Sequence, residues 1–367
     1  MSLILDGSNG ITFPNSSTQA VGFYGFKNRI MNGAMVIDQR NAGASVTPTN
    51  GQYLVDRFGA GLTQASKFTA QQSTTAPAGF VNSQLVTSSS AYSIGSTDRF
   101  WLYQSIEGLN VADLAWGTAS AATVTLSFWV RSSLTGTFGG SLQNGAQNRS
   151  YPFSFTINSA NTFEYKTITI AGDQSGTWLT TNAVGIYLNI GLGVGSTYSG
   201  TAGSWAASTY FSATGATSVV GTNGATFYIT GVQLEAGSTA TSFDYRPYGT
   251  ESNLCWRYCF VQGYAQGSGA YGSIGVGVNQ STTAVAVDYF LPVPMRTTPS
   301  LTWTTATYSD INSGASGTVI ASNTPRSGPT QLFLQGTYTS GTATAGSVAF
   351  LNMANITTWQ AIFSAEL

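Results

Sequence analysis

The chain has 367 residues and no histidine, two cysteines and 7% charged residues, with 13 basic against 14 acidic side chains. Histidine is the commonest general base and metal ligand, so Ser-His-Asp and Cys-His catalysis are excluded, and two thiols alone cannot complete a four-ligand zinc site. The balanced charge offers no field for nucleic acid or an anionic membrane. We therefore expect a non-enzymatic protein without cofactor or metal, folded around a core that 42% hydrophobic residues supply.

Residues 1–25 form a short leading segment. Leu3-Ile4-Leu5 and Ile11-Thr12-Phe13 flank a stretch with two glycines, which predicts a β-hairpin too small to hold a core alone. The segment lacks the basic start of a signal peptide, and no run of 18 apolar residues follows anywhere in the chain. We expect synthesis in a cytoplasm, with Cys255 and Cys259 reduced and buried as small hydrophobes.

Residues 26–248 contain short runs rich in Val, Ile, Thr and aromatic residues, separated by Gly and Ser clusters. Several alternate apolar and polar side chains with the period of a half-buried strand, and in one of them Val124, Leu126, Phe128 and Val130 share a face. The runs follow one another too closely for helical crossovers. We therefore predict an all-β fold whose first domain is an antiparallel jelly-roll sandwich.

The sequence predicts a short helical linker over residues 249–263 and a C-terminal β-sandwich domain over residues 264–367. Thr250 can cap the helix, and Leu254, Tyr258 and Val261 fall on one face. That apolar face either lies on the axis of a trimer or covers the end of the preceding sandwich. Strand-like runs follow at 284–290, 300–303, 331–334 and 359–363.

Several phrases resemble tail fibres and other receptor-directed virion proteins of tailed bacteriophages. They are Asn28–Met35 with Ile37–Arg40, Val55–Phe58, Phe128–Arg131, Gly231–Gly237 leading to Phe243–Pro247, Phe290–Arg296 and Phe363–Leu367. In that family the phrases up to Pro247 open and close a jelly-roll module similar to carbohydrate-binding modules, and the last two resemble its C-terminal strand module. The resemblance implies a homotrimer located in the virion. It also implies an N-terminal segment, here Leu3, Ile4, Leu5, Ile11 and Phe13, that docks to another virion protein.

Aromatic residues carry the prediction of a glycan-binding function. The apolar faces of sugars stack on indole and phenol rings, while Asn, Gln and Asp bind the hydroxyl groups. The candidates in the C-terminal region are Tyr264, Tyr271, Trp303, Tyr308, Tyr338 and Trp359, and Trp178 and Trp205 are candidates in probable loops of the first domain. Trp101, Trp116 and Trp129 are expected in the core. Core packing is the competing interpretation for every one of these rings.

The remaining motifs are weaker. Gly267–Gly272 matches a dinucleotide fingerprint, but strand-like sequence follows it where the chemistry requires a helix. Asp38, Asp56, Glu107 and Asp244 are expected in ion pairs with arginines such as Arg40, Arg57 and Arg246. Asp113, Asp173, Asp288 and Asp310 are less committed and suit calcium, although no D-x-D-x-D run supports a site.

These observations favour a trimeric tail fibre that attaches a virion to a bacterial surface polysaccharide without catalysis, with residues 264–367 as the binding tip. Two alternatives stay open. One is a purely structural virion component, such as a head fibre, an adaptor or a tail-tip scaffold. The other is a glycan depolymerase, because a suitably spaced pair among the 14 carboxylates would suffice.

Overall fold

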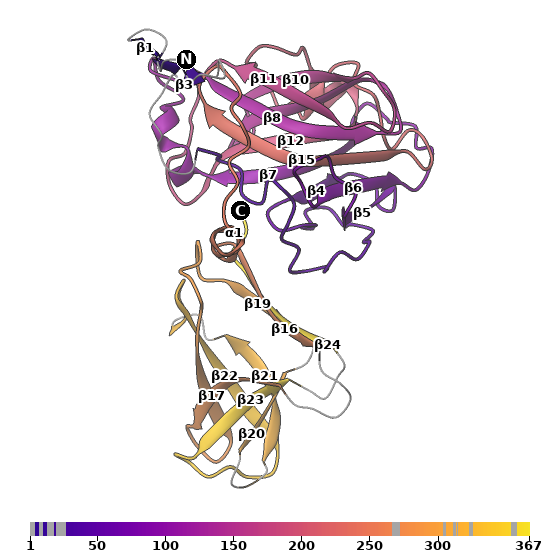
Figure 1. The fold of residues 1–367 in the computed structure, drawn as a ribbon. Coiled ribbons are helices and arrows are strands. Elements are labelled where there is room, and N and C mark those ends of the chain that lie inside the picture. The colour runs from indigo at the N-terminus through magenta and orange to yellow at the C-terminus, as the bar shows by residue number, and fades with distance from the viewer. Residues whose placement is uncertain are drawn as a thin grey trace.

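The structure is a computed structural model that describes the chain except residues 1–3, 7–9, 13–17, 20–26, 266–271, 304–305, 311–312, 314, 323–325 and 354–357. Figure 1 shows a large β body and a smaller one, joined near the helix α1 (Tyr248–Trp256). Within the described ranges, no helix has the length and apolar character needed to cross a membrane.

Two five-stranded sheets form the larger body. The first contains, in spatial order, β10 (Ser150–Ile157), β9 (Gly136–Asn144), β12 (Val184–Val194), β7 (Arg99–Glu107) and β4 (Gly59–Leu62). The second contains β11 (Glu164–Ile170), β8 (Val124–Ser132), β15 (Thr226–Ala236), β6 (Ser83–Ser88) and β5 (Phe68–Ser73). Neighbouring strands pair antiparallel throughout both sheets. The predicted all-β sandwich is confirmed.

The core of this body lies between its two sheets. Val124, Leu126, Phe128 and Val130 are all fully buried, as their alternation predicts, and Phe138 of the facing sheet belongs to the same cluster. Burying a side chain of this size stabilises the fold by about 1.5–3 kcal/mol. Short elements complete the body: η1 (Gly108–Asn110), η2 (Ala112–Leu114), η3 (Ser196–Tyr198), β13 (Ser199–Gly200) and β14 (Ser212–Ala213).

The leading segment contains the predicted hairpin. β1 (Ile4–Asp6) pairs antiparallel with β2 (Gly10–Thr12), with Leu5 opposite Ile11, and β3 (Thr18–Gln19) adds a third strand. Leu3 and Phe13, two of the residues expected to dock on the virion, lie outside the described residues. The docking role itself stays a prediction.

The helix α1 is shorter than predicted. It begins after Pro247 and ends at Trp256, and β16 (Cys259–Ala265) starts three residues later. Val261 therefore lies in a strand, and Tyr258 lies between the two elements, fully buried within the chain. The proposed apolar helix face of Leu254, Tyr258 and Val261 was wrong, because aromatic and β-branched residues after Trp256 pair with β24 (Thr358–Ser364) instead. The Tyr258 ring is buried within its own chain, and the trimer axis stays a prediction.

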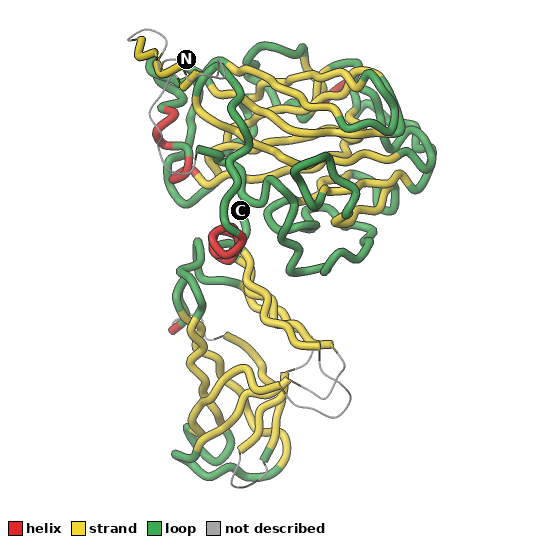
Figure 2. Tube along the Cα trace, in the orientation of Figure 1, coloured by secondary structure: helices red, strands yellow, loops and turns green. Residues whose placement is uncertain are grey.

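The C-terminal strands form a barrel where a sandwich was expected. β17 (Gly272–Asn279), β18 (Ala284–Phe290), β22 (Gln331–Ser340), β21 (Ser316–Ser322), β20 (Ala306–Asp310) and β23 (Val348–Met353) close on themselves. Closure leaves no unpaired strand edge. β16, β24 and β19 (Ser300–Trp303) form a separate sheet, whose β16–β24 pair is the long strand ribbon between α1 and the barrel in Figure 2.

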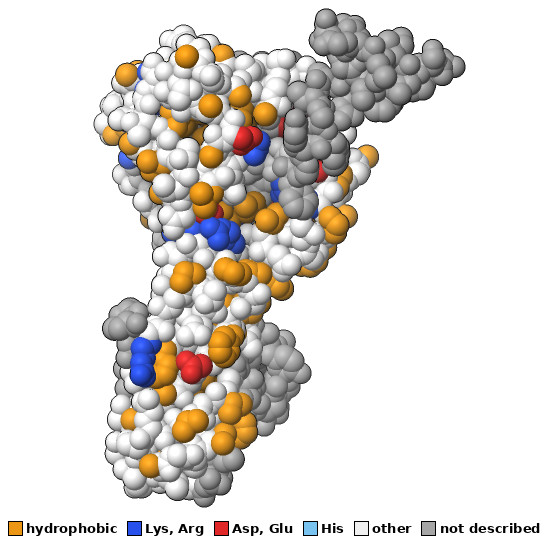
Figure 3. All heavy atoms as spheres, turned by 90° about the vertical axis from the view of Figure 1, so that its left-hand side faces the viewer, with side chains coloured by type: hydrophobic (Ala, Val, Ile, Leu, Met, Phe, Trp, Pro, Cys, Tyr) orange, Lys and Arg blue, Asp and Glu red, His pale blue; other side chains and the backbone are white. Residues whose placement is uncertain are grey.

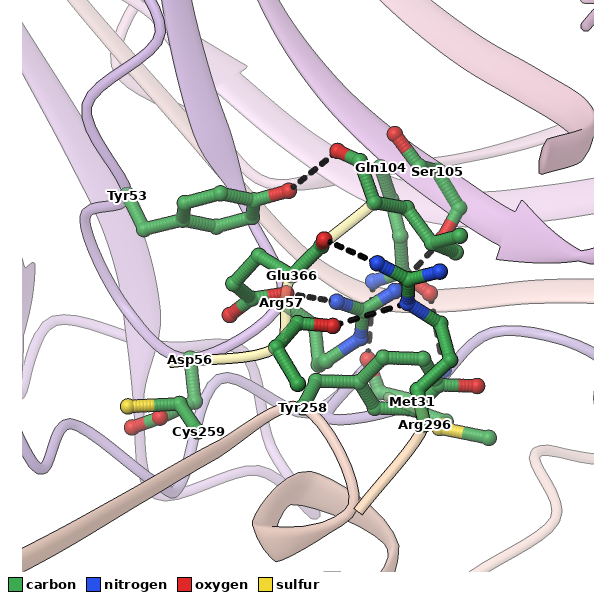
Figure 4. Close-up of polar contacts among 12 residues, drawn as sticks. Met31, Tyr53, Asp56, Arg57, Gln104, Ser105, Tyr258, Cys259, Arg296 and Glu366 are labelled. Atoms are coloured by element: carbon green, nitrogen blue, oxygen red, sulfur yellow. Dashed lines mark hydrogen bonds and ion pairs between the residues drawn. The ribbon is translucent and has the colours of Figure 1, made fainter. Parts of the chain in front are cut away.

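The last residues of the chain return to the larger body. Glu366 forms ion pairs with Arg57 and, at 3.0 Å, with Arg40, and the Arg57 guanidinium lies 3.6 Å from the centre of the Tyr258 ring. Arg296 donates to the backbone carbonyls of Ala365 and Glu366. Figure 4 shows Arg57, Tyr258, Arg296 and Glu366 converging from segments far apart in the sequence. We call this set of contacts the junction.

Two of the four acids expected in ion pairs, Asp56 and Glu107, form them with arginines. Asp56 does pair with Arg40, at 3.5 Å, but Arg57 binds Glu366 and Arg246 binds Glu251. Glu107 pairs with Arg257 at 2.6 Å and accepts a hydrogen bond from Tyr258. Asp38 and Asp244 accept backbone hydrogen bonds instead. Both cysteines are buried and free, as predicted.

Candidate functional site: the open aromatic face

The molecular surface is nearly neutral. In Figure 3 charged side chains are sparse, and uncharged polar and backbone atoms surround scattered hydrophobic ones. Two of the calcium candidates are already paired, Asp113 with Arg29 and Asp173 with Arg149, each at 2.5 Å. Across the described part of the chain, no group of three acidic or cysteine side chains gathers to hold a metal.

The C-terminal aromatic candidates are placed as follows. Tyr338 is buried in the barrel and donates its hydroxyl hydrogen to Asn279, so its assignment to a glycan was wrong. Trp303, Tyr308 and Trp359 lie on β19, β20 and β24, and Tyr264 lies on β16. The side chains of these four, and the whole of Tyr271, fall outside the described residues. Their role stays a prediction.

Three tryptophans cluster among loops of the sandwich. Trp116, Trp178 and Trp205 pack edge to face with centroids 4.7–5.4 Å apart, beside a small hollow lined by Leu179 and Ile186. Each indole N–H donates to a backbone carbonyl, so no indole donor is left for a ligand. We interpret the cluster as an extension of the core.

The outer face of the β7-containing sheet is covered by the chain itself. The ring centroids of Trp101 and Phe211 are 4.5 Å apart, and Phe211 belongs to the segment around β14. Beneath this segment Asn189 donates to Ser141 and Gln143, and Gln143 donates to the carbonyl of Tyr210. Polar groups that would suit a sugar are therefore already bonded to one another.

On the outer face of the β8-containing sheet, the segment after β15 covers one end, where Thr125 and Thr169 donate to the carbonyls of Gly237 and Ser238. The rings of this face lie at the other end. Trp129 and Tyr165 are paired in register on β8 and β11, with ring centroids 5.3 Å apart, and Tyr165 is 42% exposed. Two residues further along β8, Arg131 lies opposite Tyr228 of β15. Phe163 packs edge to face on Tyr228, with the ring centroids 6.1 Å apart. We call these five residues the open aromatic face.

The aromatic surface continues past β15. A side chain at Gly231, whose φ is +61°, would meet both the Phe80 ring and the Trp129 ring, so these rings flank this glycine. Phe80 in turn contacts Tyr245 at 5.4 Å, and Tyr245 is 56% exposed. Three strand spacings of about 4.8 Å make this strip about 15 Å wide, enough for a short oligosaccharide.

Strand alternation positions these rings. Phe128 and Val130 point into the core, so Trp129 and Arg131 between and beyond them must point outward. The expectation that Trp129 and Trp101 belong to the core was therefore wrong, whereas Trp116 is buried as expected. The same period-two alternation that correctly predicts a buried Phe128 predicts an outward-facing Trp129. The expectation of a core position came from the hydrophobicity of tryptophan alone.

The chemistry available on the open aromatic face is stacking and hydrogen-bond donation. Ring faces suit the C–H surfaces of sugars, and the Arg131 guanidinium supplies donors. Thr230, in register with Trp129, has a buried hydroxyl oxygen without a hydrogen-bond partner among the described residues. None of the five residues is acidic, so the face itself contains no pair of carboxylates for glycoside hydrolysis.

No protein-family model matches the sequence, and neither does any curated protein. Among solved structures, the family 11 carbohydrate-binding module of a Clostridium thermocellum cellulase is similar over 54% of this chain and 98% of its own, with 11% identity and a TM-score of 0.27. TmCBM61, solved with β-1,4-galactotriose, is similar over 57% of this chain and 99% of its own, with 9% identity and a TM-score of 0.29.

A third similar structure is the enzymatically active domain of bacteriophage CBA120 tailspike protein 4. The match covers 57% of this chain but only 22% of that one, with 13% identity and a TM-score of 0.31. The two-sheet sandwich is established by the strand pairing described above, and TM-scores of this size add nothing to it.

Proposed function

We propose that this chain is a non-catalytic glycan-binding protein that attaches a bacteriophage to a bacterial surface polysaccharide as a tail fibre. The observation that carries the proposal is the open aromatic face, where Trp129 and Tyr165 present adjacent rings and Tyr165 is 42% exposed. The near-neutral surface supports it, because little charge opposes contact with a polysaccharide. The phrases that resemble phage tail fibres support the assignment to the virion.

The proposed fibre is a homotrimer whose first 25 residues dock to another virion protein. Trimerisation multiplies weak sugar contacts through effective concentration, so a modest affinity per face suffices for adhesion. Light scattering of the purified chain should give about 115 kDa, three times the 38.3 kDa of one copy. A stable 38.3-kDa monomer would reduce the proposal to a single lectin-like module.

The binding claim is tested with surface polysaccharides purified from candidate hosts and immobilised for affinity measurement. Trp129→Ala and Tyr165→Ala should each weaken binding about tenfold or more, because a central aromatic anchor contributes about 2 kcal/mol or more and about 1.4 kcal/mol corresponds to tenfold. Phe290→Ala is the matched control, since this ring is 72% exposed but lies on the barrel. Loss of binding in the control alone would move the site to the C-terminal tip.

The same samples test the absence of catalysis. A binding protein leaves the polysaccharide intact, so no new reducing ends should appear during prolonged incubation. Steady release of reducing ends would instead establish a depolymerase. A chain that binds no polysaccharide but is needed for particle assembly would be a structural virion component.

A further inference from the structure

Arg131 is a cation without a counter-charge in the described chain. Seven of the thirteen Lys and Arg residues form ion pairs with carboxylates, and Arg131 is not among them. Its contacts are with rings: the guanidinium carbon lies 5.1 Å from the Tyr228 centroid and 5.9 Å from that of Phe163. Its Nε is buried without a hydrogen-bond partner among the described residues.

Among the side chains that the structure describes, no carboxylate on this face is placed to neutralise Arg131. Glu235 lies on the same side of β15, but it pairs with Thr125, six residues from Arg131 along β8, or about 20 Å away. Its carboxylate already accepts hydrogen bonds from Gln233 and Thr241. Glu164 precedes Tyr165 in β11, so alternation places it toward the opposite side, where it pairs with Lys166.

We propose that the open aromatic face recognises an acidic polysaccharide, with the Arg131 guanidinium receiving a sugar carboxylate while the Trp129 and Tyr165 rings stack on a neighbouring sugar ring. The inference rests on the proposed glycan-binding function and specifies its ligand class. Trp129 and Arg131 are two residues apart on β8, so their side chains are separated by about 6.6 Å along the strand. That separation lets one ligand contact both.

Electrostatics favour an anionic ligand over a neutral one. A neutral glycan laid over this face would further remove an unpaired guanidinium from water, which is costly because no opposite charge compensates for the lost hydration. A carboxylate supplies that charge and accepts two parallel N–H donors from the planar guanidinium. Stacking on Tyr228 and Phe163 holds the guanidinium plane in place before the ligand arrives.

The test uses the full chain with polygalacturonate, alginate and hyaluronan, each beside its carboxyl-reduced counterpart, at one fixed ionic strength. We expect at least one acidic polymer to bind about tenfold or more tightly than its reduced form. Arg131→Gln should abolish that preference. Arg131→Lys keeps the positive charge but loses the two parallel N–H donors of the guanidinium, so it should retain part of the preference. Lys166→Gln removes the same charge from a residue paired with Glu164 at 2.6 Å and should leave the preference intact.

The outcomes distinguish failure of the acidic-ligand inference from failure of the proposed glycan-binding function on which it rests. Equal binding of acidic and reduced polymers, binding of neutral polymers alone, or a preference that survives Arg131→Gln would overturn the acidic ligand and leave glycan binding standing. Failure to bind any carbohydrate would overturn both. Circular dichroism of each variant checks that the sandwich is folded, and Arg131→Lys keeps the test decisive if the glutamine variant does not fold.

Discussion

Glu366 anchors the junction, and its removal should strongly destabilise the chain. Its carboxylate is the anion paired with Arg57, whose side chain is only 2% exposed. Glu366→Ala leaves that guanidinium buried without a counter-charge, with the Ser105 carbonyl and the Tyr258 ring as its remaining contacts. Breaking a buried pair from one side costs about 3–5 kcal/mol. We expect Glu366→Ala to lower the free energy of unfolding by about 3 kcal/mol, the lower end of that range. The reason is that Arg40, the second partner of Glu366, still pairs with Asp56.

The assay is urea unfolding of the full chain, followed by tryptophan fluorescence and circular dichroism. Asp113→Ala is the matched control, because it also removes one carboxylate from an arginine but at a site where Asp113 is 59% exposed. An exposed pair contributes about 0–1 kcal/mol, so the control should change little. Equal losses in the two variants would refute the reasoning that burial of Arg57 sets the cost.

Three further predictions concern other buried groups. Burial raises the pKa of Asp56 from 3.8 to about 6 despite Arg40 and the Gln39 donors beside it, with Glu366 also raising it. The folded state then binds more protons at Asp56 between these values, so the contribution of Asp56 to the free energy of unfolding should fall as pH rises from about 4 to about 6. In urea titrations, Asp56→Asn should therefore be less destabilising, relative to the unchanged chain, at about pH 6 than at about pH 4. Cys255 and Cys259 are buried with raised pKa values, so a thiol reagent at pH 8 should label them only after unfolding; rapid labelling of the native chain would contradict this. Gly61→Val should cost about 1–3 kcal/mol, because a side chain there meets the Trp101 ring, and an unchanged thermal midpoint would show that the ring moves away freely.

Local patterns in the sequence predicted the sandwich well. Val124, Leu126, Phe128 and Val130 are buried because period-two alternation is a property of the strand itself, and it can be recognised without knowing the strand's neighbours. The hairpin of β1 and β2 was also predictable locally, because two short apolar runs flank a glycine-containing loop. Trp129 was misplaced only because residue type was given more weight than its position in the pattern.

Long-range features were not predictable. Arg57 and Glu366 are 309 residues apart, and no local pattern marks them as partners. The end of α1 depends on pairing between β16 and β24, which are separated by the whole barrel sequence. Whether the C-terminal strands close into a barrel or form two packed sheets depends on the same kind of distant pairing.

The most direct test of the central claim is hydroxyl-radical footprinting of the chain with and without a polysaccharide that it binds. Radicals label exposed rings, and a bound glycan protects those it covers. The account predicts protection of Trp129, Tyr165 and Tyr228, with Phe290 unchanged. Protection confined to the barrel, or no protected ring on the sandwich at saturating polysaccharide, would contradict the assignment of the open aromatic face as the binding site.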